Sequence, residues 1–351
     1  MKKLGDPSSE SAVAAKRADL IILVQQLIRS QILPKQIEFI GEDEDIPNPR
    51  GNAKICFRVN YASLPAGSAS MVPASTPLAG GGLLGLLTLL TPSAEYFVSY
   101  DMPLELSQWL LGLRHSYVDT LACCCWLTDR KLLLCLRYFH PRRSLADLIA
   151  SSGPVDVKLI QLFGAQILEG LMYFFTIGYP YGGCLHPGNV LLRSDTHVVL
   201  SDYENAALSL SPSYLLVHSN TMASEVEAFG YLLYEMATGK VPPTPDARHP
   251  APLSTDALLA HANPALLHLM RTIFQADAGS PPTLMTLREH PFFAVTVTDS
   301  HSALPDTSPS ISAHLQALKR SFIKSNKAFL TAVRKRQARE AAAQEKMHAM
   351  T

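Results

Sequence analysis

The sequence predicts an α+β protein with two lobes, a small β-rich lobe followed by a helical lobe, and a basic helix at the C-terminus. Three observations support this order. Apolar runs of strand length precede Pro141, patterns of helical period follow it, and the last part of the chain is strongly basic. With 351 residues and 47% hydrophobic content, the chain is large enough to bury a core in each lobe.

The first segment, residues 1–50, combines a predicted helix with an acidic turn. Residues 9–31 repeat apolar side chains at helical spacing. The string "GEDEDIP" that follows is acidic, but it lacks the alternating ligand spacing of a calcium-binding loop. We therefore expect a solvated turn there.

Residues 51–140 are predicted to form the β-rich lobe. A low-complexity loop is expected over residues 60–92, which are rich in Ser, Ala, Pro and Gly. The string "EYFVSY", residues 95–100, predicts a strand. "TLACCCWL" and "KLLLCLRYF" are apolar runs on either side of a polar pair, which predicts a hairpin of two buried strands.

Residues 141–300 are predicted to form the helical lobe. Helical periodicity and terminating signals recur in "SLADLIAS", "VKLIQLFGAQILEGLMYFFTIG", "SEVEAFGYLLYEMATG", "PALLHLMRTIF" and "TLMTLREHPFF". Two short strands, "VLL" and "VVL", flank a polar turn between the second and third of these helices.

Composition excludes some classes of function. The 30 Lys and Arg balance the 30 Asp and Glu, so no global charge favours a nucleic-acid partner. Three of the six cysteines are adjacent in "LACCCWL", which indicates small buried apolar side chains with reduced thiols rather than a disulfide framework or a metal site. We expect a cytoplasmic protein.

One loop has the spacing of a phosphotransfer site. "YGGCLHPGNVLL" fits the end of the pattern H-R-D-x-x-x-x-N, in which the Asp takes the substrate hydroxyl proton and the Asn holds metal. With Asn189 on the Asn of the pattern, Gly182, Gly183 and Cys184 stand where His, Arg and Asp would be. Asp202, in "LSDYENAAL", lies thirteen positions after Asn189.

The order of these parts from Glu95 to Phe293 resembles a protein kinase. The hairpin, "HPGNVLL", "LSDYENAAL", the central apolar helix and "LREHPFF" follow one another as the corresponding kinase parts do. The strings "DYEN", "LHPGN" and "FGYLLYEMATGKVPP", with the basic C-terminal helix, resemble the branch that contains the PX-domain kinase-like protein and Slowpoke-binding protein. No PX domain is visible in the sequence, which favours the Slowpoke-binding type.

The resemblance implies that metal ligands survive as Asn189 and Asp202 while the base is lost. Cys184 stands in place of the base, and a thiol with its ordinary pKa of about 8.5 is mostly neutral near pH 7, unlike a carboxylate. His186 replaces the family Lys that contacts the transferred phosphate. It could act as a base, but we favour an ordinary structural or solvent-facing His. We expect no required cofactor and regard Mg-ATP binding as doubtful.

The resemblance also implies that the phosphate-binding parts are degenerate. If "EYFVSY" is the third kinase strand, Ser99 is the nearest counterpart of its Lys. "GGGLLG" satisfies G-x-G-x-x-G with Gly80, Gly82 and Gly85, yet in this Gly-rich setting a flexible loop is the better interpretation. Between Asp202 and the central helix there is no A-P-E string.

Residues 301–351 are predicted to contain a basic amphipathic helix, a form that calmodulin and anionic membrane surfaces accept. A helix packed along the larger lobe is an equally good interpretation. Ser144 and Ser321 follow basic residues and could bind 14-3-3 when phosphorylated. The candidate partner-binding residues of the tail are Lys319, Arg320, Phe322, Lys324, Phe329, Arg334, Lys335 and Arg336.

The prediction for function is a catalytically inactive pseudokinase that acts as a scaffold or regulatory binding protein. By resemblance, its partners would be the cytoplasmic region of a calcium-activated potassium channel, 14-3-3 and calmodulin, at the inner face of the plasma membrane. Two alternatives remain: a weak Ser/Thr kinase that uses Asn189, Asp202 and His186, and a trafficking adaptor that contacts the membrane through the tail.

Overall fold

A computed structural model describes most of the expected elements. The described residues are 37–42, 54–61, 83–90, 105–127, 132–138, 144–179, 181, 184–207, 222–242, 263–274, 282–294 and 302–303, with residues 22, 26, 309, 311–312 and 315–316. The chain divides into two compact units. The smaller unit holds a five-stranded sheet and the helical residues Ile22 and Gln26, and the larger unit holds the other described helices and two short sheets.

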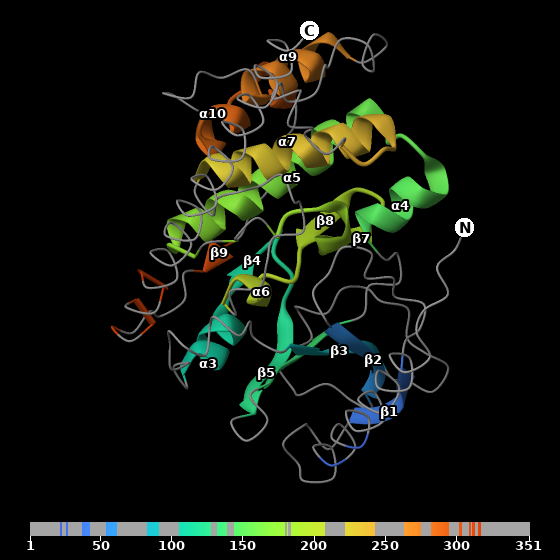
Figure 1. Ribbon diagram of the computed structural model, residues 1–351, viewed down its shortest axis with the longest axis vertical. Coiled ribbons are helices and arrows are strands. Elements are labelled where there is room, and N and C mark those ends of the chain that lie inside the picture. The colour runs from blue at the N-terminus through green and yellow to red at the C-terminus, as the bar shows by residue number, and fades with distance from the viewer. Residues whose placement is uncertain are drawn as a thin grey trace, which may run out of the picture. The chain divides into compact units, whose positions relative to one another are not determined.

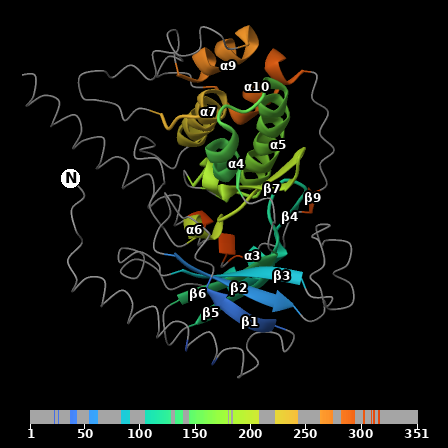
Figure 2. The same ribbon diagram turned by 90° about the vertical axis from the view of Figure 1, so that its right-hand side faces the viewer.

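The smaller unit is an antiparallel sheet in the order β1-β2-β3-β6-β5 (Figure 2). Its strands are β1 (Ile37–Glu42), β2 (Lys54–Tyr61), β3 (Leu83–Leu90), β5 (Leu121–Leu127) and β6 (Leu132–Tyr138). The predicted hairpin of two apolar strands is confirmed as β5 and β6. Leu133, Leu134 and Leu136 of β6 are fully or almost fully buried, as expected for a strand covered on both faces.

Strand β3 corrects the expected loop over residues 60–92. Residues 83–90 form a full-length strand between β2 and β6, so the loop prediction was wrong for this part. Gly85 pairs with Val59 on one side and with Tyr138 on the other. The physical reason is that "LLGLLTLL" is also an apolar run of strand length, and its ladder hydrogen bonds outweigh the low strand preference of one glycine.

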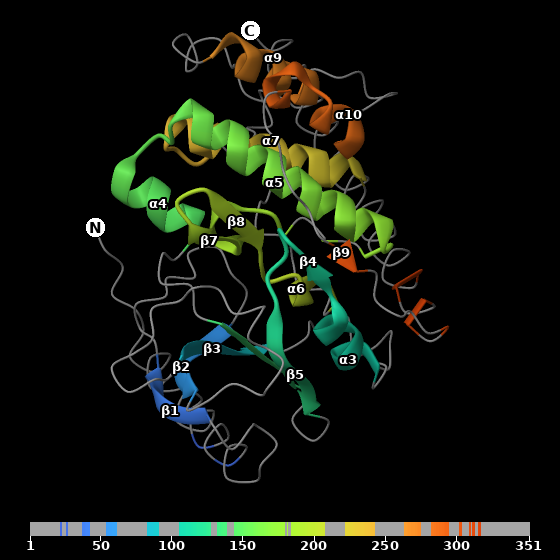
Figure 3. The same ribbon diagram turned by 180° about the vertical axis from the view of Figure 1, so that it is seen from behind.

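The larger unit is built around two long helices, α5 (Val157–Thr176) and α7 (Met222–Thr238), which lie side by side (Figures 1 and 3). Helix α5 is long and apolar enough to cross a membrane by length and composition, but most of it is buried inside the unit, as in the core helix of a soluble fold. The other helices of the unit are α3 (Glu105–Gly112), α4 (Leu145–Ser152), α6 (Glu204–Ala207), α9 (Pro264–Phe274) and α10 (Leu284–Arg288).

Two short sheets complete this unit. The hairpin β7 (Val190–Ser194) and β8 (His197–Leu200) matches the predicted strands on either side of a polar turn. Strand β4 (Arg114–His115), next to α3, pairs with β9 (Ser302–Ala303) from near the end of the described chain.

Glycines allow the helices of the larger unit to approach one another closely. A Cβ atom on Gly164 of α5 would lie 2.9 Å from the ring of Phe293, and one on Gly230 of α7 would lie 2.6 Å from the ring of Phe274. Both distances are shorter than normal carbon contacts, so a larger residue would force the neighbouring rings to move. Phe293 is fully buried, which shows that this contact belongs to the core.

Several predictions fall outside the described residues. They are the strand at 95–100, the part of the acidic turn beyond Glu42 and the tail beyond Gln316. The helix over 9–31 is described only at Ile22 and Gln26, both helical. At the start of the tail, Ile311 and Leu315 are helical and buried, with 1% and 5% exposure. This burial agrees with the interpretation in which the first turn of the tail packs against the protein itself.

Candidate functional site

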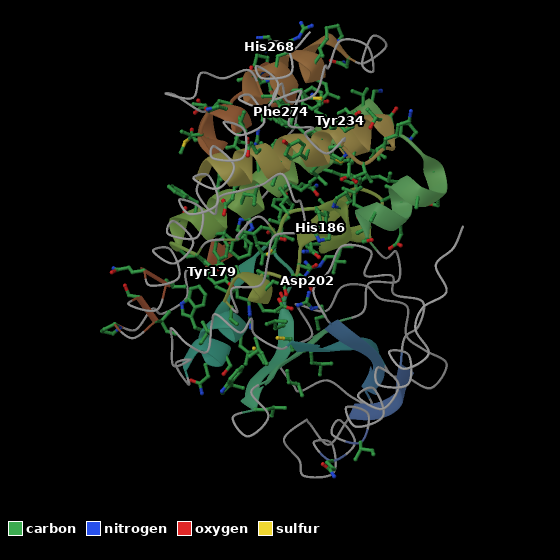
Figure 4. All side chains as sticks on the ribbon, in the orientation of Figure 1. Tyr179, His186, Asp202, Tyr234, His268 and Phe274 are labelled. Atoms are coloured by element: carbon green, nitrogen blue, oxygen red, sulfur yellow. The ribbon has the colours of Figure 1, made fainter. Side chains whose placement is uncertain are left out.

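The candidate site is the loop between α5 and β7, together with the residues that follow β8. Its centre is the short 3-10 turn Pro187–Asn189. His186 caps this turn, because its Nδ1 atom accepts a hydrogen bond from the backbone N–H of Gly188 at 3.1 Å. Pro187 occupies the first position of the turn. A backbone N–H there would have no partner within the turn, so its absence in proline costs no hydrogen bond. Figure 4 shows His186 and Asp202 at this site and His268 at the other end of the larger unit.

Asn189 holds the loop closed. Its side-chain Nδ2 donates to the carbonyl oxygen of Cys184 at 2.8 Å, across the turn. Its own carbonyl oxygen accepts from the backbone N–H of Ser201 at 2.8 Å and from the Ser201 hydroxyl at 3.1 Å. Asn189 and Ser201 are both buried, so these bonds fasten the loop to the segment that carries Asp202.

Asp202 adopts a left-handed backbone conformation with φ of 58°, alone among the non-glycine residues that the structure describes. This conformation is unfavourable for most residues, and surrounding contacts must hold it in place. The carbonyl of Asp202 accepts from the N–H of Asn205 at 3.1 Å, which begins the short helix α6. Asp202 is half-buried, whereas the next two residues, Tyr203 and Glu204, are fully buried.

Two tyrosines fix the backbone on both sides of Asp202. The hydroxyl of Tyr181 donates to the carbonyl of Ser201 at 2.8 Å, and the hydroxyl of Tyr179 donates to the carbonyl of Tyr203 at 2.5 Å. The Tyr179 ring also contacts Trp109 of α3, with ring centroids 5.4 Å apart. We refer to Tyr179 and Tyr181 as the tyrosine clamp. Sequence reasoning missed it, because nothing in "YPY" indicates which distant carbonyls the hydroxyls reach.

Helix α7 anchors the same loop through Glu225. The carboxylate of Glu225, in the first turn of α7, accepts a hydrogen bond from the backbone N–H of Tyr181 at 3.1 Å. Glu225 is 7% exposed, so the bond is shielded from water. The sequence identified Glu225 only as the start of a helix. Its contact with a loop 44 residues away depends on tertiary packing.

The predicted reactive positions fill structural roles. Cys184 is 2% exposed and His186 is 3% exposed. The Nδ1 atom of His186 is used as a cap, which requires that nitrogen to be unprotonated. Burial and capping therefore favour the structural interpretation of His186 over a base, and the expectation of a solvent-facing side chain was wrong.

The metal-binding prediction has partial physical support. Asn189 Oδ1 and the Asp202 carboxylate are oxygen donors of the type that Mg²⁺ prefers, and Asn189 uses its nitrogen, not this oxygen, to close the loop. Within the described ranges, no three His, Cys, Asp or Glu side chains gather into a metal-binding group. That Asn189 and Asp202 would hold a magnesium ion stays a prediction; the role of such an ion would be to bind nucleotide phosphates.

The phosphate-binding predictions need correction. We expected the third strand at 95–100 with Ser99 as the degenerate position, but the strand between β2 and β6 is β3, Leu83–Leu90. Its sequence contains no Lys or Arg, so the loss of the strand-three Lys still follows. Gly85 lies in this strand and not in a loop. Ser99, Gly80, Gly82 and the eight tail residues predicted to bind partners lie outside the described residues.

Curated relatives of this chain are kinase-like proteins. It is 29% identical over 197 residues to the probable inactive serine/threonine-protein kinase slob2 of Dictyostelium discoideum, covering 51% of this chain and 33% of that protein. It is 31% identical over 183 residues to the PX domain-containing protein kinase-like protein of Mus musculus, covering 46% and 30%. It is 31% identical over 174 residues to Slowpoke-binding protein of Drosophila melanogaster, covering 42% and 33%.

These matches span about a third of the length of the relatives. More distant relatives include named protein kinases, such as mitogen-activated protein kinase kinase 2 of Arabidopsis thaliana, at 24% identity over 178 residues. No family model matches the chain.

Solved protein kinases share the fold. A MAP kinase from Leishmania major superposes with a TM-score of 0.56 at 15% identity, covering 89% of this chain and 99% of that one. Rad53 superposes with a TM-score of 0.55 at 14% identity, covering 74% and 66%. Such low identities establish the fold alone. The chain therefore has a protein-kinase-like fold, and in sequence it resembles the kinase-like branch that includes slob2, the PX domain-containing protein kinase-like protein and Slowpoke-binding protein.

Proposed function

We propose that this protein is a pseudokinase that recognises partners without transferring phosphate. One observation carries the proposal: the loop keeps its closed shape while Cys184, at the position of the base, is a buried thiol. Asn189 donates to the Cys184 carbonyl, and Glu225 accepts from the Tyr181 N–H in the preceding turn, so these bonds do not depend on the side chain of Cys184.

The catalytic base and the strand-three Lys, both missing here, each stabilise the transition state strongly in a kinase. Loss of one preorganised transition-state interaction, worth about 3 to 4 kcal/mol, slows catalysis by about a hundredfold to a thousandfold. Here the base is replaced by Cys184, and strand β3 carries no Lys. Both defects act on the same step, because the Lys positions the phosphates and the base orients the acceptor hydroxyl.

For the partner, we propose the cytoplasmic region of a potassium channel, with the protein at the inner face of the plasma membrane. The support is the similarity to Slowpoke-binding protein, whose name states that it binds Slowpoke. The basic residues of the tail supply a second surface, for calmodulin or anionic lipid. These assignments rest on resemblance and charge.

Of the two serines, Ser321 is the better candidate for binding 14-3-3 when phosphorylated. Ser144 caps helix α4: its hydroxyl donates to Asp147 Oδ2 at 2.7 Å and accepts from the Asp147 N–H at 3.3 Å. A phosphate on Ser144 would face that carboxylate and break the cap. Binding through Ser144 would therefore require the start of α4 to open.

The alternative of a weak kinase is disfavoured by the burial of His186 and its role as a cap. A phosphotransfer assay with Mg-ATP and peptide substrates tests this choice. We expect no transfer above background from the wild-type protein. Transfer that disappears in Asp202→Ala would establish an active kinase and contradict the proposal.

The binding proposal needs its own test. The full-length chain should capture a channel cytoplasmic fragment, and the Lys335→Glu/Arg336→Glu variant should show whether the tail contributes. Lys158→Glu/Lys240→Glu is the matched control, because both lysines are exposed on the larger unit. Loss of binding in the tail variant but not in the control supports a role for the tail. If the channel fragment does not bind and anionic vesicles co-sediment with the chain, the membrane-adaptor alternative is favoured.

A further inference from the structure

Two thiols face each other across the β5–β6 hairpin of the smaller unit. Cys124 and Cys135 are directly opposite in the strand register, and their Sγ atoms are 3.8 Å apart. Both residues are buried, with 6% and 0% exposure. This pair has no part in the kinase-like loop, which belongs to the larger unit.

The register distinguishes Cys124 from its two cysteine neighbours. Cys123 is opposite Leu136, and Cys125 is opposite Leu134. Directly opposite residues of neighbouring strands lie on the same face of a sheet, so Cys124 and Cys135 share one face. Of the three adjacent cysteines, Cys124 is therefore the one that the register places opposite another thiol.

The backbone of this pair suits a disulfide bond. Directly opposite residues of antiparallel strands have Cα atoms about 4.5 to 5.5 Å apart, and disulfides span Cα separations of about 4.4 to 6.8 Å. The two sulfur atoms are already in contact at 3.8 Å. Rotation of the two side chains, with little movement of the strands, would bring them to bonding distance.

We infer that Cys124 and Cys135 form a redox-responsive pair that a peroxide converts into an intramolecular disulfide. In the first step the Cys124 sulfur attacks hydrogen peroxide, becomes a sulfenic acid and releases water. In the second step the Cys135 sulfur attacks the sulfenic sulfur, the S–S bond forms, and a second water leaves. The two thiols together lose two electrons and two protons, and one peroxide is reduced to two waters.

Burial determines the order of the steps and the choice of oxidant. Cys124 retains slight exposure and Cys135 has none, so the small peroxide reaches Cys124 first and Cys135 resolves the intermediate. Bulky disulfide oxidants should react more slowly, because they cannot approach a sulfur inside the sheet. Thiol–disulfide exchange with a dithiol reductant reverses the bond.

The position of the hairpin gives the bond a structural effect. The chain returns to the smaller unit at Thr120, just before β5, and leaves it for the last time at Pro141, soon after β6. A bond between Cys124 and Cys135 fixes these two strands to each other. Oxidation therefore tightens the hairpin from which the chain continues into the larger unit.

The experiment treats the folded wild-type protein with hydrogen peroxide, blocks free thiols and digests without reduction. Trypsin cuts after Arg130 and Lys131, so peptides 115–130 and 132–137 separate unless a disulfide joins them. We expect the joined pair, two hydrogen atoms lighter than the sum of the same peptides with Cys123 and Cys125 blocked and Cys124 and Cys135 free, and its loss on treatment with dithiothreitol. Cys124→Ala should abolish the joined product, whereas Cys123→Ala/Cys125→Ala should retain it.

Three results would overturn the inference. The first is a wild-type protein whose Cys124 and Cys135 stay reduced while other cysteines are oxidised. The second is a joined product that survives in Cys124→Ala. The third is a sulfenic acid on Cys124 that accumulates without cross-linking. Fragmentation of the joined wild-type peptides, which locates the bond at Cys123, Cys124 or Cys125, decides the question even if a variant fails to fold.

Discussion

Tyr179 and Tyr203 are joined by a short hydrogen bond, in which the Tyr179 hydroxyl donates to the Tyr203 carbonyl at 2.5 Å. Both tyrosines are buried, and Tyr203 directly follows the left-handed Asp202. With Tyr181 bound to the carbonyl of Ser201, the clamp restrains the residues on both sides of the strained position. The conformation of Asp202 is therefore held by contacts within the protein.

Replacing Tyr179 by Phe should destabilise the protein by about 1 to 2 kcal/mol, because the buried Tyr203 carbonyl loses its hydroxyl donor. Urea denaturation measures the change. Thr176→Val is the control: it removes a hydroxyl-to-carbonyl bond at an exposed site and should cost less than about 0.5 kcal/mol. Equal losses of stability in the two variants would show that the Tyr179 hydrogen bond contributes no more than a bond at an exposed site.

Glu225→Ala should destabilise the protein by about 1 to 3 kcal/mol, because the N–H of Tyr181 would be left buried without its acceptor. Glu225→Gln should cost less, since its amide oxygen can take the place of the carboxylate oxygen. Glu227→Ala serves as the control, because Glu227 is exposed on the same helix. Thermal unfolding of the three variants checks this order. A Glu225→Ala variant as stable as the wild-type protein would contradict it.

Gly230→Ala should destabilise the protein by about 1 to 3 kcal/mol despite the higher helix propensity of alanine. The added Cβ would lie 2.6 Å from Phe274 and 2.8 Å from Ile273, which forces α7 and α9 apart. Chemical denaturation measures the loss. A stabilised variant would mean that the Phe274 ring can swing aside at no cost, and Phe274→Leu in the Gly230→Ala background would test that relief.

Acid should weaken the fold through His115. Burial lowers the pKa of His115 to about 4, from an ordinary value of 6.5. The unfolded chain therefore binds the proton first, so the stability contribution is complete above about pH 6.5 and is lost as the pH falls toward 4. The free energy of unfolding, measured from pH 7.5 to 5, should fall less steeply in His115→Phe, which keeps a ring to stack on Tyr173. Parallel slopes in the two proteins would exclude His115 as the source.

Cys184→Asp alone should leave phosphotransfer undetectable, because the third strand of the sheet still lacks a Lys. The variant should also lose stability, since position 184 is buried and a carboxylate there is poorly solvated. A radiolabel transfer assay together with thermal unfolding separates the two effects. Appreciable turnover by a folded Cys184→Asp protein would contradict the assignment of the missing groups.

Local patterns predicted much of the fold. Helix α9 has the bounds that its periodicity indicates, and β5 and β6 follow their apolar runs almost residue for residue. Strand β3 was missed because its glycine and its Gly-rich flank resemble a low-complexity loop. The two-residue strands β4 and β9 were missed because they are too short to have a period.

The sequence also predicted part of the candidate site. Spacing placed Asn189 and Asp202 on one loop system, and the structure connects them through Ser201. The burial of Cys184, the capping by His186 and the anchor from Glu225 all depend on contacts between residues distant in the chain or on the local turn geometry. Periodicity and motif spacing contain no information about such contacts.

The anchor from Glu225 to the N–H of Tyr181 acts on a backbone group, as do the bonds from Asn189 and Tyr181 to the carbonyls of Cys184 and Ser201. Any amino acid except proline offers the same amide, and every residue offers the same carbonyl. The shape of the loop therefore depends little on the side chain of Cys184, the position of the base. A kinase-like chain held in this way can exchange that side chain and still present an unchanged surface to whatever it binds.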